Sequence, residues 1–232
     1  SYRFLERHGF RKVALVFTIP NAAWKGRKLL KSFPDQLIVF AQQAKDEGKP
    51  LVILFQDEAR FGRVQSPRRC WALQNVRPKA KSQTTRQYLY AYGAINPLEG
   101  TFVSLCLPRA DTLCMNVFLE EVAAVYPDAY VVMFLDQAAW HKSKTLKIPP
   151  NIHFEHIPPY SPELNPTEMA WKTLRNGFFH NAYFNSLQAV ENRLCQALSH
   201  YVHHKEILRS ACGFDWIPAY AHYCPGKVEY EG

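Results

Sequence analysis

Apolar residues form two kinds of pattern along the chain, continuous runs and helical repeats. Residues 51–57 and 130–136 are apolar runs that each end in aspartate, and such runs are typical of strands buried on both faces of a sheet. Residues 87–95 and 101–107 flank a short loop with Pro and Gly, and this order predicts a β-hairpin. Shorter strands are predicted at residues 70–74 and 152–157.

Helical repeats separate and follow these runs. Apolar residues recur with helical spacing in residues 35–48, 112–126 and 186–204. A further helix is predicted to begin at Pro166, since proline is favoured in the first turn of a helix. Residues 13–34 hold prolines and a basic run, which predicts a linker. An antiparallel meander followed by alternating strands and helices predicts an α/β fold, with a mixed sheet flanked by helices.

The charge balance points to a polyanionic partner. The chain of 232 residues has 28 Lys and Arg against 20 Asp and Glu, a net charge of +8. This excess favours nucleic acid first and an anionic membrane surface second, although a basic protein without such a partner has the same balance. No apolar run approaches the roughly 20 residues of a membrane helix. The six scattered cysteines lack a CxxC motif and indicate reduced thiols in a cytosolic protein.

Three carboxylates follow strands or begin a helix at positions that could form a metal site. Asp57 and Asp136 end the two apolar strands, and neighbouring strands would bring both to the carboxyl edge of the sheet. Two close carboxylates repel unless a cation lies between them, and oxygen ligands select Mg²⁺ or Mn²⁺. Glu168, in the first turn of the helix at Pro166, is the candidate third ligand. Each has a simpler explanation: a strand-end Asp is often a turn former, and Glu168 lies three residues after Asn165, as in a capping box.

Three segments of the chain resemble the motifs of the DDE transposases. They are Phe55-Gln-Asp-Glu-Ala-Arg-Phe-Gly62, Leu135-Asp-Gln-Ala-Ala-Trp-His-Lys-Ser143 and Pro159-Tyr-Ser-Pro-Glu-Leu-Asn-Pro-Thr-Glu168. The chain is similar to the bacterial insertion-sequence branch of the mariner-like superfamily over residues 50–200, and the last motif is the most specific. The resemblance implies an RNase H-like fold in which Asp57, Asp136 and Glu168 bind two Mg²⁺ ions, with Mn²⁺ as a substitute. Glu163 remains an alternative third ligand.

The same resemblance implies a function and a division of the chain. It implies a transposase that cleaves DNA at the ends of an insertion sequence and transfers the freed strand to target DNA, as a homodimer in the bacterial cytoplasm at the nucleoid. Residues 1–49 would hold the remnant of an N-terminal DNA-binding region, a linker and a connecting helix. Residues 50–204 would form the catalytic domain and residues 205–232 an irregular C-terminal tail. Two alternatives are a non-catalytic DNA-binding remnant of a truncated transposase and another RNase H-like nuclease.

Basic side chains near the three motifs are candidate contacts to DNA phosphates, although a solvated loop would account for them equally well. They are Arg60, Arg63, His141, Lys142, Lys144, Lys172 and Arg175. Trp140 and Trp171 are of a type that stacks on an unpaired base, but burial in the core is the favoured interpretation for both.

Overall fold

The computed structural model describes residues 22–64, 79, 81, 83–158, 161 and 164–213, with only the backbone described for residues 22–32 and 34. The predicted strand at 70–74 lies outside these residues. Within them, no helix combines the length and apolarity that a membrane crossing requires.

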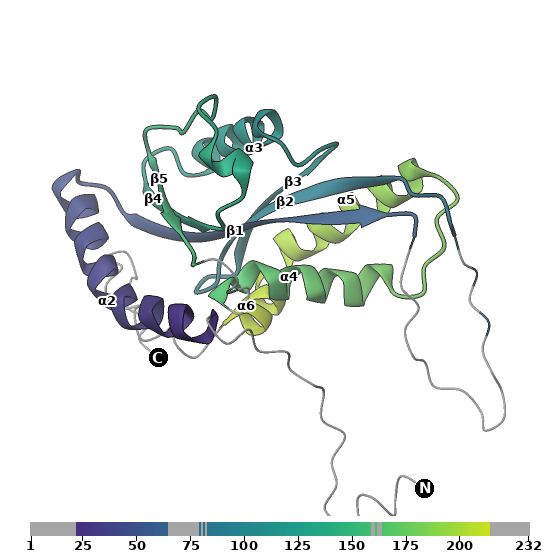
Figure 1. The fold of residues 1–232 in the computed structure, drawn as a ribbon, viewed down its shortest axis with the longest axis horizontal. Helices are drawn as coiled ribbons and strands as arrows, with labels where there is room; N and C mark the ends of the chain where they lie inside the picture. Colours follow the sequence, from purple (N-terminus) through teal and green to yellow (C-terminus); the bar gives the residue numbers. More distant parts are fainter. Residues whose placement is uncertain are drawn as a thin grey trace, which may run out of the picture.

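A five-stranded mixed sheet forms the centre of the structure (Figure 1). The strands are β1 (Leu51–Gly62), β2 (Tyr88–Asn96), β3 (Thr101–Leu107), β4 (Tyr130–Leu135) and β5 (Ile152–His156), in the order β3-β2-β1-β4-β5. Strands β1, β2 and β3 pair antiparallel, whereas β4 is parallel to both β1 and β5. The predicted antiparallel meander followed by parallel strands is therefore confirmed, and the sheet is RNase H-like.

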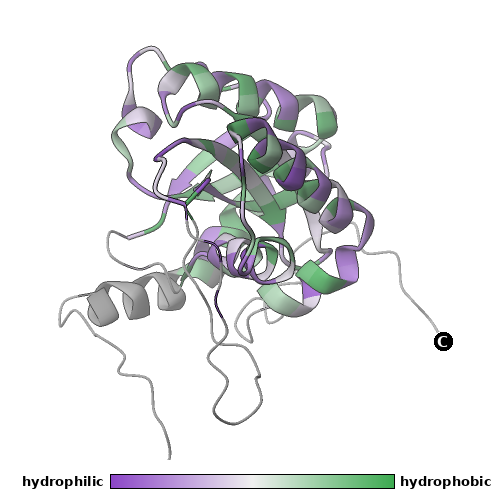
Figure 2. Ribbon diagram, turned by 90° about the vertical axis from the view of Figure 1, so that its right-hand side faces the viewer, coloured by the Kyte–Doolittle hydropathy of each residue, from purple (hydrophilic) through white to green (hydrophobic). Residues whose placement is uncertain are grey.

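Helices cover both faces of this sheet. They are α2 (Ala22–Asp46), α3 (Thr112–Val125), the 3₁₀ helix η1 (Ala139–Lys142), α4 (Pro166–Leu174) with the π-helical turn η3 (Arg175–Phe179), α5 (Leu187–His203) and α6 (Lys205–Cys212). Helix α3 packs on one face, and α2, α4, α5 and α6 pack on the other (Figure 1). Figure 2 shows mostly hydrophobic strands between helices of mixed character.

Strand β1 contributes to both apolar cores. Ile53 and Phe55 belong to the cluster under α2, α4, α5 and α6, whereas Leu54 belongs to the cluster under α3, together with Met115 and Phe118. Successive side chains of a strand point to opposite faces, so a strand covered on both faces needs apolar residues without interruption. This explains the continuous apolar run in the sequence.

Helix α2 corrects the prediction for the start of the chain. The predicted linker at 13–34 is helical from Ala22 onward, and Pro34 lies inside the helix. A proline in a helix interior removes one backbone hydrogen bond and bends the helix, and α2 is bent in Figure 1. The helix continues past the proline because Phe33 and Leu37 on either side of it are buried against the sheet.

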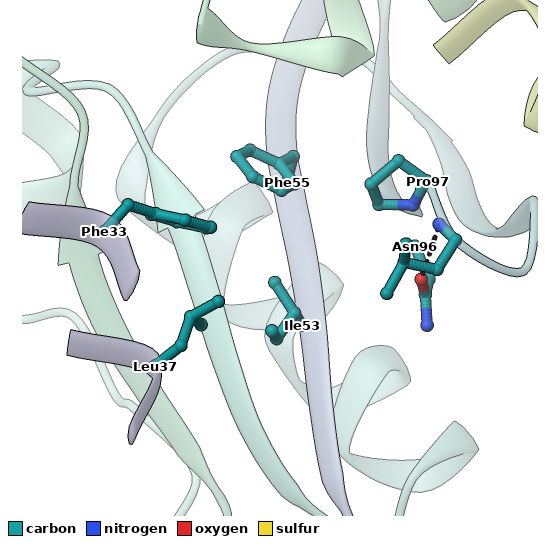
Figure 3. Close-up of a pocket in the computed structure, with 7 residues that line it drawn as sticks. Phe33, Leu37, Ile53, Phe55, Asn96 and Pro97 are labelled. Atoms are coloured by element: carbon teal, nitrogen blue, oxygen red, sulfur yellow. Dashed lines mark hydrogen bonds between the residues drawn. The ribbon is translucent and has the colours of Figure 1, made fainter. Parts of the chain in front are cut away.

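A small gap remains where α2 meets the sheet. Figure 3 shows Phe33 and Leu37 of α2 facing Ile53 and Phe55 of β1, with Pro97 of the β2–β3 turn beyond them. The cavity measures about 10 Å³ and its lining is almost entirely apolar. One water molecule requires about 10–15 Å³ and several polar partners, so this gap is a packing defect and not a ligand site.

The segment predicted as an irregular tail begins with a helix. Leu208 and Cys212 of α6 are fully buried, and α6 packs against α4, α5 and β3. Gly100 in the β2–β3 turn has φ +72° and lies against the backbone of Lys205, where a Cβ atom would clash. The turn therefore requires glycine both for its backbone conformation and for its contact with α6.

Candidate active site

The two aspartates lie side by side on neighbouring parallel strands. The β1–β4 register runs from Leu51 opposite Tyr130 to Phe55 opposite Phe134. Continued by two residues, this register places Asp57 beside Asp136, just past the end of β4. Asp57 does not end its own strand, because β1 continues to Gly62 while paired with β2. Asp57 is therefore not a turn former, and the prediction that its strand ends at residue 57 was wrong.

Helix α4 is attached to β1 directly in front of Asp57. The Asn165 side chain accepts a hydrogen bond from the Thr167 amide (3.1 Å) and donates to the Gln56 carbonyl (2.9 Å). The Thr167 hydroxyl donates to the Phe55 carbonyl (2.6 Å). Asn165 and Thr167 are buried, so these bonds hold the start of α4 without competition from water.

Trp171 connects the same helix to the Asp57 carboxylate. Its side chain is buried, as the sequence suggested, and its Nε1–H donates to Asp57 Oδ2 at 3.1 Å. Gly93 of β2 pairs with Asp57, and a Cβ atom there would lie 2.6 Å from the indole and 2.7 Å from the Phe102 ring. The glycine thus provides the space in which the indole lies over the sheet.

Glu168 occupies the first turn of α4 and is exposed. Its amide donates to the Asn165 carbonyl (3.2 Å), but among the residues described its carboxylate accepts no hydrogen bond. It therefore does not close a capping box with Asn165, and its oxygens remain available. Glu163 lies outside the described residues, so the choice between the two glutamates stays a prediction.

Negative charge accumulates around Asp57. Burial raises the pKa of Asp57 well above its usual value, and the carboxylates of Glu168, Glu58 and Asp136 raise it further. Asp136 is more exposed, and the hydrogen bond from His141 lowers the pKa of its carboxyl. A divalent cation would relieve the repulsion around Asp57, and carboxylate oxygens are the ligands that Mg²⁺ and Mn²⁺ prefer.

In their present conformations the described side chains do not form a complete set of metal ligands. Among the described residues, no three or more His, Cys, Asp or Glu side chains converge in a metal-binding arrangement. Asp57 Oδ2 is occupied by Trp171 and Asp136 Oδ1 by His141. The residues fit a hard divalent cation by charge and by donor type, with Asp57, Asp136 and Glu168 as the oxygens at this sheet edge.

Residues 52–191 match the family model described as DDE superfamily endonuclease. The chain belongs to this family. It is also 38% identical over 111 residues to "Uncharacterized protein y4pE/y4sA" of Sinorhizobium fredii (strain NBRC 101917 / NGR234), which covers 47% of this chain and 82% of that protein.

Solved structures of the Mos1 transposase have the same fold as this DDE endonuclease. The Mos1 mariner paired-end complex with Mn is 13% identical with a TM-score of 0.57, covering 98% of this chain and 70% of that one. The complex with Mg is 16% identical with a TM-score of 0.57, covering 97% and 69%. The Mos1 strand transfer complex is 14% identical with a TM-score of 0.54, covering 98% and 70%. At these identities the likeness is one of fold.

Glu58, His141 and Trp140 form a polar group on the face of β1 opposite to Asp57. The role of Glu58 in this group was not predicted from the sequence. Glu58 is nearly buried and accepts hydrogen bonds from His141 and from Trp140. Burial alone would lower the pKa of His141, but its hydrogen bonds to Asp136 and Glu58 outweigh burial and raise that pKa to about 9. The role of Glu58 could have been suspected from the alternation of side chains along a strand, which places the residue after Asp57 on the opposite face of the sheet.

Two of the residues predicted to contact DNA form hydrogen bonds to other residues of the protein instead. His141 is buried and both its ring nitrogens bond within the protein, so we do not propose it as a phosphate contact. Arg63 donates to the carbonyls of Phe184 (3.3 Å) and Asn185 (2.7 Å) and to the Gln87 side chain (2.8 Å). Arg63 therefore joins the end of β1 to the loop before α5.

The other predicted cations are exposed, namely Arg60, Lys142, Lys144, Lys172 and Arg175. The Arg60 guanidinium lies 4.8 Å from the centre of the Tyr88 ring, and that of Arg175 lies 5.0 Å from the centre of the Phe61 ring. Burial lowers the pKa of Arg175, while Glu168 and Asp57 act in the opposite direction, so this cation is close to the carboxylates. These side chains remain candidate phosphate contacts.

Proposed function

We propose that this chain is the catalytic part of a transposase that cleaves DNA at the ends of an insertion sequence and joins the freed strand to target DNA. The observation that carries the proposal is the position of Asp57 in a DDE superfamily endonuclease: the sheet register places it beside Asp136, and the carboxylates of Glu168 and Asp136 both raise its pKa. Two of these carboxylates lie on adjacent parallel strands, and the third is on a helix hydrogen-bonded to the first strand.

In this proposal the three carboxylates hold two Mg²⁺ or Mn²⁺ ions. Such ions supply activation of the attacking oxygen and stabilisation of the leaving oxygen in phosphodiester cleavage. Asp57 is held in place by the indole N–H of Trp171, and Glu168 is positioned by the buried attachment of α4 to β1. Among the residues described, the Glu168 carboxylate accepts no hydrogen bond that would compete with a cation.

Double-stranded DNA is the proposed partner. The net charge of +8 favours a polyanion, and the exposed Arg175 is close enough to Glu168 and Asp57 for both to act on its pKa. The Mos1 structures of the same fold are described as paired-end and strand transfer complexes, which supports element ends and target DNA as substrates of a homodimer. The division into residues 1–49, 50–204 and 205–232, and action at the bacterial nucleoid in the cytoplasm, rest on the resemblance and stay predictions.

The test is DNA cleavage and joining by the full chain. The purified protein is incubated with Mg²⁺ or Mn²⁺ and labelled DNA from the sequences that flank its gene, with a plasmid as target. We expect Asp57→Asn, Asp136→Asn and Glu168→Gln each to lower the rate of cleavage by more than about 100-fold. Loss of a residue that only supports a metal ligand costs about 10–100-fold, and loss of a ligand itself should cost more. Asp128→Asn is the matched control, because Asp128 is an exposed carboxylate at the opposite end of β4.

The outcome separates the proposal from its alternatives. Cleavage without any joined product indicates an RNase H-like nuclease that does not transfer strands. Salt-sensitive DNA binding without cleavage indicates a non-catalytic remnant. Activity that survives all three substitutions excludes the carboxylates as the active site.

A contact with DNA is tested by its salt dependence. Removing one phosphate contact lowers the slope of log affinity against log salt by about 0.9. We expect this change for Lys172→Ala, because Lys172 is exposed on the same helix as Glu168. Arg63→Ala is expected to leave the slope unchanged, because the Arg63 side chain is bonded within the protein.

A further inference from the structure

A buried polar network lies behind the exposed carboxylate of Asp136. It consists of Gln56, Glu58, Trp140 and His141, and we refer to it as the Glu58 network. One oxygen of Glu58, Oε1, accepts from Gln56 Nε2 (3.1 Å), from Trp140 Nε1 (3.2 Å) and from His141 Nε2 (3.0 Å). A buried carboxylate is costly unless hydrogen bonds compensate for its lost water, and three donors do so here.

His141 links this network to the candidate site. Its Nδ1 lies 2.9 Å from Asp136 Oδ1, and its Nε2 lies 3.0 Å from Glu58 Oε1. The exposed fraction of the side chain is 7% for Glu58, 1% for His141 and 60% for Asp136. The imidazole therefore connects a buried carboxylate to an exposed one and is fixed at both ends.

The bonds to Asp136 are unevenly divided between its two oxygens. Oδ1 accepts a hydrogen bond from the Ala138 amide at 2.9 Å and lies 2.9 Å from His141 Nδ1, which also bonds to the main-chain carbonyl of Asp136 at 3.2 Å. Oδ2 accepts no hydrogen bond from any residue that the structure describes. An exposed carboxylate at the end of a strand would otherwise rotate freely, because its torsion is broad. The Ala138 amide bonds to Oδ1 and the His141 imidazole is close to both Oδ1 and the main-chain carbonyl of the same residue, so Oδ1 is held and Oδ2 is the oxygen left open.

We propose that His141 and Glu58 are positioning residues of the candidate site: Glu58 anchors His141, and His141 fixes the Asp136 carboxylate so that Oδ2 binds the divalent cation. This inference rests on the proposed function, since it takes Asp136 as a metal ligand. Outer-shell partners of this kind orient the ligands of a metal site and are worth about 10–100-fold in metal affinity. Neither His141 nor Glu58 contacts the metal in this proposal.

Two substitutions of His141 separate positioning from simple packing. The amide nitrogen of asparagine corresponds to Nδ1 of histidine, and that of glutamine corresponds to Nε2. His141→Asn therefore keeps the donor to Asp136 and loses the donor to Glu58. His141→Gln keeps the donor to Glu58 and loses the donor to Asp136. A purely structural role favours glutamine, because it satisfies the buried carboxylate.

The measurement is binding of Mn²⁺ alone to the full chain, followed by electron paramagnetic resonance of the free ion. We expect His141→Gln to lower Mn²⁺ affinity by about 10–100-fold and His141→Asn to lower it less than about threefold. Trp140→Phe is the control, because it removes one donor to Glu58 and leaves the bond between His141 and Asp136 intact. Thermal unfolding of every variant reports whether the fold is retained.

Each result decides the matter. Equal Mn²⁺ affinity for the wild type and a folded His141→Gln variant overturns the positioning role, as does a stronger loss with asparagine than with glutamine. If the His141→Gln variant does not fold, the Glu58→Gln variant is measured in its place. Weaker Mn²⁺ binding by this variant is the expected result, and unchanged binding would contradict the inference. Wild-type Mn²⁺ binding that Asp136→Asn does not weaken overturns the proposed metal site and this inference together. Binding that depends on Asp136 but not on His141 overturns only the inference.

Discussion

Asp57 and Glu58 are adjacent residues of one strand with opposite surroundings. The Asp57 carboxylate is half-buried near three other carboxylates, with the Trp171 indole N–H on one oxygen. The Glu58 carboxylate is nearly buried, but it has three donors on one oxygen, including His141. Strand alternation sends the two side chains to opposite faces of the sheet, where α4 lies on one side and η1 on the other.

This contrast distinguishes the carboxylate that is open to a ligand from the one that is satisfied within the fold. Glu58 is compensated from within the chain, so it contributes to the structure without any added ion. Asp57 is surrounded by charge of its own sign, and its raised pKa shows that the fold does not neutralise it. A half-buried carboxylate with this imbalance is typical of functional sites.

The largest expected effect is the loss of Glu58. Glu58→Ala leaves His141 and Trp140 buried without their acceptor, and breaking a buried ion pair costs about 3–5 kcal/mol of unfolding free energy. Urea unfolding followed by circular dichroism measures this change. Glu99→Ala, at an exposed glutamate, is the control and is expected to change stability by less than about 0.5 kcal/mol. A similar small change for Glu58→Ala would contradict the compensated role of Glu58.

The next effect concerns the binding of a divalent cation at Asp57. Mn²⁺ at 100 times its dissociation constant is expected to stabilise the fold by about 2.7 kcal/mol, since it binds the folded chain. A chelator should remove this gain, and Asp57→Asn should abolish it. Thermal unfolding with and without Mn²⁺ provides the measurement. An equal gain in the wild type and in Asp57→Asn would show that the ion binds elsewhere.

A smaller effect is expected from Gly93, the partner of Asp57 in β2. The added methyl group of Gly93→Ala would contact the Trp171 and Phe102 rings at 2.6 and 2.7 Å, and overpacking of this kind costs about 1–3 kcal/mol. Since the displaced indole carries the donor to Asp57, cleavage should fall as well. Unfolding and cleavage are measured on the same preparation. Wild-type values for both would mean that the indole moves without consequence.

The smallest effect is a gain in stability. Because the pKa of Asp57 is raised in the folded chain, the unfolded chain releases this proton at lower pH, and stability falls as the pH rises through that interval. Asp57→Asn removes this penalty and should raise stability at pH 7, without metal, by about 1 kcal/mol or about 2–4 °C in Tm. A lower Tm at pH 7, compared with the wild type in chelator, would refute the view that Asp57 is uncompensated.

Local patterns were sufficient for the elements that present the carboxylates. The apolar runs predicted β1 and β4, the Pro/Gly loop predicted the β2–β3 hairpin, and Pro166 marked the start of α4. Each of these signals depends on the periodicity of a strand or helix, or on one residue's backbone preference. The same local rules failed at Pro34 and at residues 205–212, where packing against the rest of the fold keeps α2 and α6 helical.

The strands and the helix that carry Asp57, Asp136 and Glu168 could be predicted from the chain alone, because strand and helix patterns are encoded by near neighbours. The partners of each carboxylate could not be predicted, because they depend on contacts between distant segments. Trp171 lies 114 residues from Asp57, and His141 lies 83 residues from Glu58. Hydrogen bonds of that span have no periodic signal in the chain, and they exist only once the sheet has brought β1, η1 and α4 together.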